Sequence, residues 1–226
     1  MDVHAVSFDV FGTLLSVAEP IGSTYAAALT VVSGSEASAE TVESRFREGF
    51  RTVTAQPDGR QLDEAAWRRI VETTFTGLCP PGSMEELFQR LWQHYSQAGA
   101  FHLLPGVISG LDKLKGQGLS LAVISNNDSR THGVLEGLGL RDYFDFVLLS
   151  AESGSAKPEV GMFREAERRL GLEPQAMLHV GDLLDEDVAG AQAAGWHVAW
   201  LGPETDGPEG VEAISNIEEL ADRLAS

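Results

Sequence analysis

Basic side chains and cysteines are scarce in this chain of 226 residues. Sixteen lysines and arginines stand against 34 aspartates and glutamates, which gives a formal net charge of −18 at pH 7. Binding to nucleic acid or to an anionic membrane surface needs clustered Lys and Arg, so this balance argues against both partners. A small anionic substrate would need a local counter-charge, and a divalent cation is the obvious candidate.

Cys79 is the single cysteine, which excludes an intrachain disulfide and favours a reducing compartment. No apolar stretch approaches the roughly 20 residues of a membrane span, and the first residues, with Asp2 among them, lack the pattern of a signal peptide. We therefore expect a cytoplasmic protein. For its assembly we expect a monomer or a weak homodimer.

Five short apolar runs have the composition of buried strands. They cover residues 3–8, 119–125, 144–150, 176–180 and 196–201. Such near-continuous apolar strands are typical of a parallel sheet that is covered on both faces. Helical stretches between the runs end in a glycine, a residue that terminates helices in the left-handed conformation. The alternation predicts an α/β fold, a Rossmann-like doubly wound parallel sheet.

Residues 16 to about 100 differ, because helical patterns dominate there and no convincing strand is found. Ser83 and Glu86 have the spacing of a capping box before an apolar helix face. We predict that residues 1–15 and 101–226 form the α/β core domain and that residues 16–100 form an inserted all-helical cap. After an exposed acidic loop at 202–210, we expect Asn216 to cap the final helix.

Four polar residues stand out because we expect each at the carboxyl end of a predicted strand: Asp9, Ser125, Lys157 and Asp182. In open parallel sheets, ligands bind outside the carboxyl ends of the strands, so we expect these side chains to meet. A carboxylate such as Asp9 can act as a nucleophile, and a hydroxyl such as Ser125 can hold an anionic oxygen. Lys157 can neutralise a nucleophile and an anion, although a solvated surface lysine is the simpler interpretation of that residue alone.

Residues 182–187 contain four acids within six positions. Carboxylates this crowded repel one another unless they hold a cation or are well solvated. Asp182 and Asp187 offer the hard oxygen ligands that Mg²⁺ prefers. The start of a helix also favours acids, which accounts for Asp185, Glu186 and Asp187 but less well for Asp182.

Taken in order, these residues resemble the haloacid dehalogenase (HAD) superfamily over nearly the whole chain. The segments similar to its four motifs are Asp9-Val10-Phe11-Gly12-Thr13, Ser125, Lys157-Pro158 and Gly181-Asp182 with Asp187. The helical insert is similar to the cap of subfamily I, and residues 121–126 and 190–196 look most like its haloacid-dehalogenase-like hydrolase domain-containing proteins.

The resemblance implies a hydrolase of small phosphorylated metabolites in which Asp9 attacks phosphorus and forms an aspartyl-phosphate. It implies catalytic roles for Ser125 and Lys157 and substrate contacts for Thr13 and Asn126. It also implies that Mg²⁺ is held by Asp9, the Phe11 carbonyl, Asp182 and Asp187.

Phe11 departs from the phosphatase pattern, which places a second Asp here to protonate the leaving oxygen. Such acid help is worth about 10²–10⁴ in rate, so we expect weak activity on alkyl phosphates and a smaller loss on aryl or acyl phosphates. An aromatic residue here is also similar to the 2-haloacid dehalogenases, whose halide leaves without an acid. The acid cluster favours the metal-dependent phosphatase, because an uncompensated substrate carboxylate would be repelled there. The third alternative is a catalytically impaired regulatory protein that binds metal or phosphate.

Other candidates carry weaker expectations. Four histidines (His94, His102, His132 and His179) have no ligand-like spacing and are expected to be structural. Trp67, Trp92 and Phe75 recur at helical spacing and are expected in the cap core. Phe46, Arg47, Phe50 and Arg51 could face the active site from the cap, although an exposed helix face is the simpler expectation for each arginine.

Overall fold

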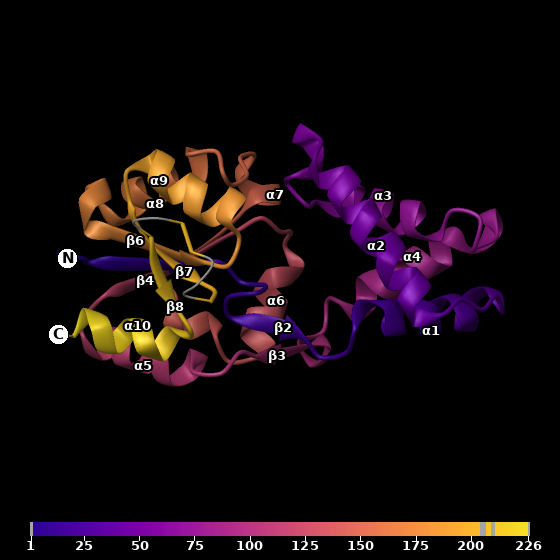
Figure 1. The fold of residues 1–226 in the computed structure, drawn as a ribbon, viewed down its shortest axis with the longest axis horizontal. Coiled ribbons are helices and arrows are strands. Elements are labelled where there is room, and N and C mark those ends of the chain that lie inside the picture. The colour runs from indigo at the N-terminus through magenta and orange to yellow at the C-terminus, as the bar shows by residue number, and fades with distance from the viewer. Residues whose placement is uncertain (1, 204–206, 209–210, 226) are drawn as a thin grey trace.

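Two lobes make up the molecule (Figure 1), and the computed structural model describes residues 2–203, 207–208 and 211–225. One lobe is built around a sheet and carries both ends of the chain, while the other is formed by helices α1 to α4. Within the described ranges, every helix is too short or too polar to cross a bilayer. Part of the loop predicted at 202–210 lies outside the described residues.

A parallel six-stranded sheet is the centre of the first lobe, in the order β5-β4-β1-β6-β7-β8. The strands are β1 (Ala5–Phe8), β4 (Ser120–Ser125), β5 (Phe146–Leu149), β6 (Met177–Gly181), β7 (His197–Leu201) and β8 (Glu212–Ile214). The predicted Rossmann-like α/β fold is thus confirmed, and the five predicted strands coincide with β1, β4, β5, β6 and β7.

Helices cover both faces of the sheet, as its apolar strands require. One face shares a hydrophobic core with α5 (Val107–Gly116), α6 (Arg130–Gly137) and α10 (Ile217–Leu224). The opposite face packs on α8 (Gly161–Leu170) and α9 (Ala189–Ala194). Figure 1 shows these two helix layers above and below the sheet. The carboxyl ends of β1 and β4 are left free to face the second lobe.

The second lobe has its own hydrophobic core. It consists of α1 (Ile21–Ser33), α2 (Ala39–Thr54), α3 (Glu64–Phe75) and α4 (Met84–His94). Aromatic rings fill the space between these helices, and Tyr25 stacks on Phe75 with ring centroids 5.8 Å apart. Short helical turns complete the fold: η1 (Pro57–Gly59), η2 (Pro81–Ser83), η3 (Ala98–Ala100), α7 (Ser150–Ser153), η4 (Arg141–Tyr143), η5 (Pro174–Ala176) and the π-turn η6 (Leu184–Val188).

Two short antiparallel strands, β2 (Leu15–Val17) and β3 (Phe101–Leu103), join the lobes. The expectation that residues 16–100 hold no strand is therefore wrong at residues 16 and 17. Three-residue strands, β8 included, are too short to show the alternation that predicts a strand. Strands β2 and β3 lie at the borders between the predicted core domain (residues 1–15 and 101–226) and the predicted cap (residues 16–100). The division into these two domains stays a prediction.

The two predicted helix caps have different outcomes. Asn216 caps α10, because its side chain accepts a hydrogen bond from the Glu219 amide at 2.9 Å. Ser83 makes no capping hydrogen bond at α4, so the predicted capping box is wrong. The turn η2 runs directly into α4 and leaves Ser83 with φ −105° and ψ −7°, whereas a capping residue is usually extended.

Candidate active site

Asp9, Ser125 and Asp182 meet at one edge of the sheet. Asp9 follows β1, Ser125 is the last residue of β4 and Asp182 follows β6. Strands β4 and β6 both pair with β1, so their carboxyl ends flank Asp9. Lys157 reaches the same place but does not come from a strand end, contrary to expectation, because helix α7 separates it from β5.

Lys157 is buried between two carboxylates. Its Nζ lies 2.7 Å from Asp9 Oδ1 and 2.5 Å from Asp187 Oδ1, and its side chain is 1% exposed. Burial acts to lower the pKa of Lys157, but the charges of Asp187 and Asp9 outweigh burial and raise it. The interpretation of Lys157 as a solvated surface residue is therefore wrong.

Three carboxylates crowd this edge. Asp9, Asp182 and Asp187 each offer an oxygen, and these oxygens lie within 4.8 Å of one another. Burial, together with the charges of Asp9 and Asp187, raises the pKa of Asp182 to about 7. Burial also raises the pKa of Asp9, although Lys157 and Ser125 oppose that shift. Because Lys157 pairs with only two of these three carboxylates, negative charge is in excess, and this donor set fits a hard divalent cation such as Mg²⁺.

Two glycines permit this crowding. Gly12 has φ +91°, a left-handed conformation that side chains rarely adopt, and a Cβ there would overlap the Asp182 carboxylate. A Cβ on Gly181 would overlap the side chain of Asp187. Both positions therefore need glycine for the carboxylates to approach the backbone.

Asp187 is held by donors on both of its oxygens. Besides Lys157, Oδ1 faces His179 Nε2 at 3.1 Å, while Oδ2 accepts from the Leu183 amide at 3.0 Å. Burial acts to raise the pKa of Asp187, but Lys157 and His179 keep it below its usual range. Burial lowers the pKa of His179, and its Nδ1 lies 2.7 Å from Ser7 Oγ. Asp187 is thus anchored by donors on both oxygens and in turn fixes Lys157.

Thr13 and Asn126, which are predicted to contact the substrate, form hydrogen bonds that orient other residues of the site. The Thr13 hydroxyl donates to Asp182 Oδ1 at 3.2 Å. The Asn126 amide donates to the Lys157 carbonyl at 2.9 Å and accepts from the Lys157 amide at 2.8 Å. Substrate contact by Thr13 or Asn126 stays a prediction. In the structure, Thr13 holds Asp182 and Asn126 holds the backbone of Lys157.

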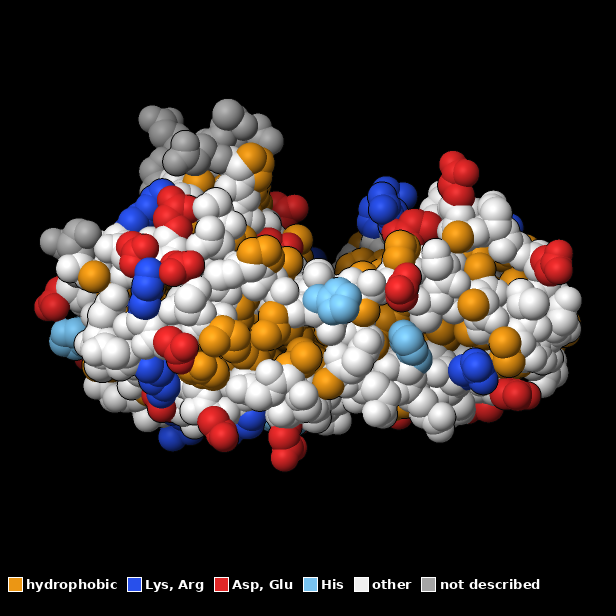
Figure 2. All heavy atoms as spheres, turned by 90° about the horizontal axis from the view of Figure 1, so that it is seen from below, with side chains coloured by type: hydrophobic (Ala, Val, Ile, Leu, Met, Phe, Trp, Pro, Cys, Tyr) orange, Lys and Arg blue, Asp and Glu red, His pale blue; other side chains and the backbone are white. Residues whose placement is uncertain are grey.

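A cavity of about 310 Å³ opens beside Asp9 and extends into the helical lobe. Figure 2 shows the notch between the two lobes. Phe46 and Phe50 line the cavity from α2, as the sequence suggested for these positions. Phe11 also lines it and packs on Phe101, with ring centroids 4.9 Å apart. The position where the phosphatase pattern has an acid therefore forms part of an apolar wall.

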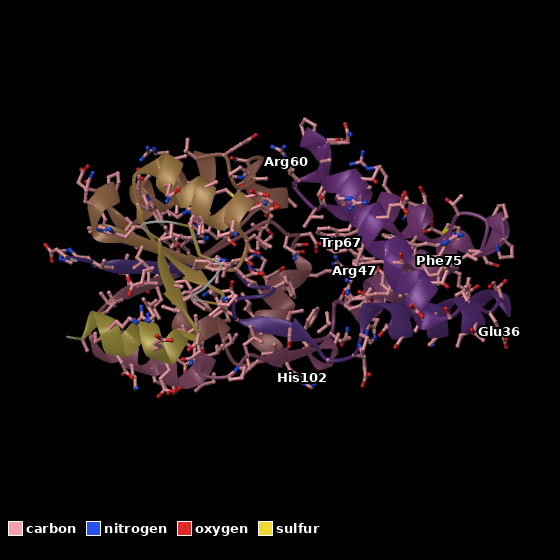
Figure 3. All side chains as sticks on the ribbon, in the orientation of Figure 1. Glu36, Arg47, Arg60, Trp67, Phe75 and His102 are labelled. Carbon is pink, nitrogen blue, oxygen red and sulfur yellow. The ribbon has the colours of Figure 1, made fainter. Side chains whose placement is uncertain are left out.

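The cap aromatics divide between core and cavity. Phe75 is fully buried in the cap core, as expected, while Trp67 and Trp92 pack against that core and also line the cavity, so the expectation for them is right only in part. In Figure 3, Trp67 lies on the side of the cap that faces the sheet lobe. Helical spacing identifies an apolar face but does not distinguish a face that packs from one that borders a cavity. Arg47 and Arg51 are exposed, in agreement with the simpler expectation for them.

Three charged or polar residues of the site were missed in the sequence. Arg130 lines the cavity, pairs with Asp128 through two hydrogen bonds of 2.8 and 2.7 Å, and lies 3.5 Å over the Trp92 ring. Glu186 also lines the cavity, and burial raises its pKa to about 7. His179 was expected to be merely structural. The only available signal was a polar residue inside the apolar run at 176–180.

Comparison with known protein families adds an independent line of evidence. The family model described as haloacid dehalogenase-like hydrolase matches residues 3–195. The chain belongs to this hydrolase family. The resemblance proposed from the four motifs is therefore confirmed, and so is the expectation of an enzyme.

Individual HAD-like hydrolases resemble this one along most of their length. The mouse (Mus musculus) haloacid dehalogenase-like hydrolase domain-containing protein 3 is 33% identical over 204 residues, which cover 87% of this chain and 81% of the relative. The crystal structure of a HAD phosphatase from Thermococcus onnurineus is 26% identical, with a TM-score of 0.70 over 98% of both chains. A 2-haloacid dehalogenase from Pseudomonas syringae is also 26% identical, with a TM-score of 0.70 over 99% of this chain and 98% of that chain. Because a phosphatase and a dehalogenase are equally similar to this chain, overall similarity does not distinguish phosphate hydrolysis from dehalogenation, and the choice must come from the residues of the site.

Proposed function

We propose that this HAD-like hydrolase is a Mg²⁺-dependent phosphatase that acts on a small phosphorylated molecule through an aspartyl-phosphate on Asp9. The observation that carries this proposal is the cluster itself, in which Asp9, Asp182 and Asp187 crowd together while one lysine pairs with only two of them, Asp9 and Asp187. An excess of carboxylates suits an enzyme that adds a cation before it binds a phosphate. It suits an enzyme without a metal poorly, because an anionic substrate would be repelled.

The chemistry would begin at Asp9. Lys157 holds Oδ1, so the other carboxylate oxygen would attack phosphorus while the bond from phosphorus to the ester oxygen breaks. The leaving group takes that electron pair and then a proton from water. Water next attacks phosphorus in the aspartyl-phosphate, the bond to Asp9 breaks, and phosphate is released with the carboxylate restored. We assign Ser125 to donate a hydrogen bond to the phosphoryl oxygens, as the family resemblance implies.

The residues present fit a bound Mg²⁺. We assign Asp9, Asp182 and the Phe11 carbonyl to hold it, with Asp187 in support because its oxygens already accept hydrogen bonds. When bound, the ion would stabilise negative charge on the phosphoryl group. Thr13 would orient Asp182, and Asn126 would keep Lys157 in place by holding its backbone. Lys157 would limit the repulsion between Asp9 and the incoming phosphate.

A 2-haloacid dehalogenase is the second candidate. The apolar wall that includes Phe11 favours it, since a halide leaves without an acid. The carboxylate of such a substrate would, however, have to sit near the acid cluster, and Arg130, the arginine in the cavity wall, is already paired with Asp128. A monomeric or weakly dimeric state and a cytoplasmic location stay predictions from the sequence.

A substrate panel distinguishes the candidates. Phenyl phosphate, acetyl phosphate, glycerol 3-phosphate and 2-chloropropionate would be tested with Mg²⁺ and with EDTA. We expect phenyl phosphate and acetyl phosphate to release phosphate with Mg²⁺ but not with EDTA. The Asp9→Asn variant should release none. Chloride release that persists in EDTA would support the dehalogenase instead. Metal binding without turnover of any substrate would support the impaired regulatory protein.

A further inference from the structure

The cavity beside Asp9 is rich in aromatic side chains. Nine of the 23 residues that line it are Phe, Tyr or Trp, and most come from the helical lobe. Its volume of about 310 Å³ is at the low end of the roughly 300–1,000 Å³ of sites that enclose small molecules. Because Asp9 is among the lining residues, a leaving group attached to phosphorus at Asp9 would extend into this cavity.

The charged residues of the cavity leave little to bind a second anion. The Arg130 guanidinium is neutralised by Asp128 and covered on one side by Trp92. Lys157 is committed to Asp9 and Asp187. Glu186 adds a carboxyl to the wall, where it accepts a hydrogen bond from Asn126 at 2.8 Å. A leaving group with its own carboxylate or phosphate would therefore be repelled.

A leaving group rich in hydroxyls fits no better. Aromatic and aliphatic walls supply few hydrogen-bond partners, so buried hydroxyls would remain unpaired. A cationic group would find the Trp92 ring, a favourable face for a cation, already covered by the Arg130 guanidinium. A neutral aromatic ring, in contrast, packs well against the edges and faces of other rings.

The backbone at the cavity wall supports a shaped pocket. Leu62 adopts φ +49°, a left-handed conformation that is rare for leucine, and its buried side chain lines the cavity. The preceding carbonyl, of Gln61, accepts a hydrogen bond from Ser150 of the sheet lobe at 2.6 Å. This contact fixes the wall of the helical lobe against the sheet lobe.

We propose that the cap cavity binds a neutral aromatic leaving group, so that the substrates are aryl monophosphates with no charge beyond the phosphate. This inference rests on the proposed phosphatase function. The inference is consistent with the lack of a proton donor at Phe11, because a phenolate leaves with less help from a proton donor than an alkoxide does. The ring of Phe11 would contact the leaving group instead of protonating it.

The test compares kcat/KM with Mg²⁺ for 1-naphthyl phosphate, 4-carboxyphenyl phosphate, 4-(trimethylammonio)phenyl phosphate and acetyl phosphate. We expect 1-naphthyl phosphate to exceed the carboxylated and the cationic aryl phosphate by at least about tenfold, the scale on which apolar pockets discriminate. Equal or faster turnover of the carboxylated or the cationic substrate would overturn the inference and leave the phosphatase function intact.

Matched variants locate the effect. Phe50→Gln should lower the ratio of kcat/KM for 1-naphthyl phosphate to that for acetyl phosphate by about tenfold, because acetyl phosphate has no aromatic ring to pack on Phe50. Phe146→Gln makes the same exchange at a half-buried ring on β5, outside the cavity, and should leave the ratio unchanged. Turnover of acetyl phosphate reports whether each variant is folded. An unchanged ratio in Phe50→Gln would contradict the proposed site.

Failure of the phosphatase function itself is distinguishable. If none of the tested phosphate compounds is hydrolysed, acetyl phosphate included, calorimetric titration with 1-naphthyl phosphate and 4-carboxyphenyl phosphate still tests whether the cavity prefers a neutral aromatic ring. Preferential binding of the naphthyl compound would support the aromatic site on a protein without this activity. Equal binding, or none, would remove the inference as well.

Discussion

At the residue scale, Phe11 places an apolar ring where the phosphatase pattern has an acid. It packs on Phe101 and contributes to the apolar wall beside Asp9. A phenylalanine has no proton to give, so a leaving group must depart as an anion or take its proton from water. The carboxylates and the lysine that we propose as nucleophile, metal ligands and counter-charge are all present, so we expect the phenylalanine at position 11 to restrict the choice of substrate.

Phe11→Asp should restore a proton donor next to the leaving oxygen. We expect kcat/KM for glycerol 3-phosphate to rise by about 10²–10⁴, the range of general acid help, with a smaller change for phenyl phosphate. Phe11→Asn is the control, since it has nearly the same size without an acidic proton. An equal rise in both variants would show that removal of the ring, and not the acid, had caused the gain.

Lys157 has a structural role that can be measured separately from turnover. Lys157→Met would leave Asp9 and Asp187 buried without their counter-charge, which typically costs about 3–5 kcal/mol of unfolding free energy. Urea denaturation at neutral pH measures this loss. Lys113→Met is the control, because Lys113 pairs with Glu218 and Asp222 at the surface and its loss should matter much less. Similar losses in the two variants would contradict the view of Lys157 as the buried centre of the cluster.

Single residues were predictable where the sequence marks a strand end. Asp9, Ser125 and Asp182 follow apolar runs, and the topology of a parallel sheet brings such ends together. Arg130 and Glu186 were not predictable in this way, because their place in the cavity depends on how the helical lobe sits over the sheet. His179 has its role only through Asp187, a contact that its strand position does not reveal.

At the element scale, local hydrogen bonds decide how firmly each helix begins. Asn216 accepts from the Glu219 amide at the start of α10, whereas Ser83 makes no such bond at α4. Asn216→Ala should therefore lower the unfolding free energy by about 1 kcal/mol, the usual value of a capping side chain. Ser83→Ala should change it much less. Thermal or urea unfolding of both variants tests the difference, and equal effects would refute the assignment of caps.

Elements were predictable in proportion to their length. The apolar runs of five or more residues became strands of the sheet, and the helical spacing that includes Trp67 and Phe75 became α3 (Glu64–Phe75). The three-residue strands β2, β3 and β8 gave no such pattern, since tertiary pairing alone holds them extended. The capping box at Ser83 failed for a related reason: the preceding turn determines the backbone there, and the spacing of side chains does not.

At the scale of the whole molecule, a net charge of −18 and a buried carboxylate cluster both favour association with cations. Mg²⁺ at 100 times its dissociation constant should stabilise the fold by about 2.7 kcal/mol, and EDTA should reverse the effect. Asp182→Asn should remove most of this gain. Asp185→Asn changes the charge equally but alters an exposed residue outside the cluster, so it should retain the gain. Equal stabilisation of the two variants by Mg²⁺ would point to diffuse binding at the acidic surface.

The covalent step on Asp9 is tested most directly by mass spectrometry of enzyme quenched in acid during turnover of phenyl phosphate with Mg²⁺. The mechanism predicts a phosphoryl group on the peptide that contains Asp9, its release by hydroxylamine, and its absence from Asp9→Asn. Steady turnover with no phosphorylated peptide, or undiminished turnover by Asp9→Asn, would contradict the mechanism.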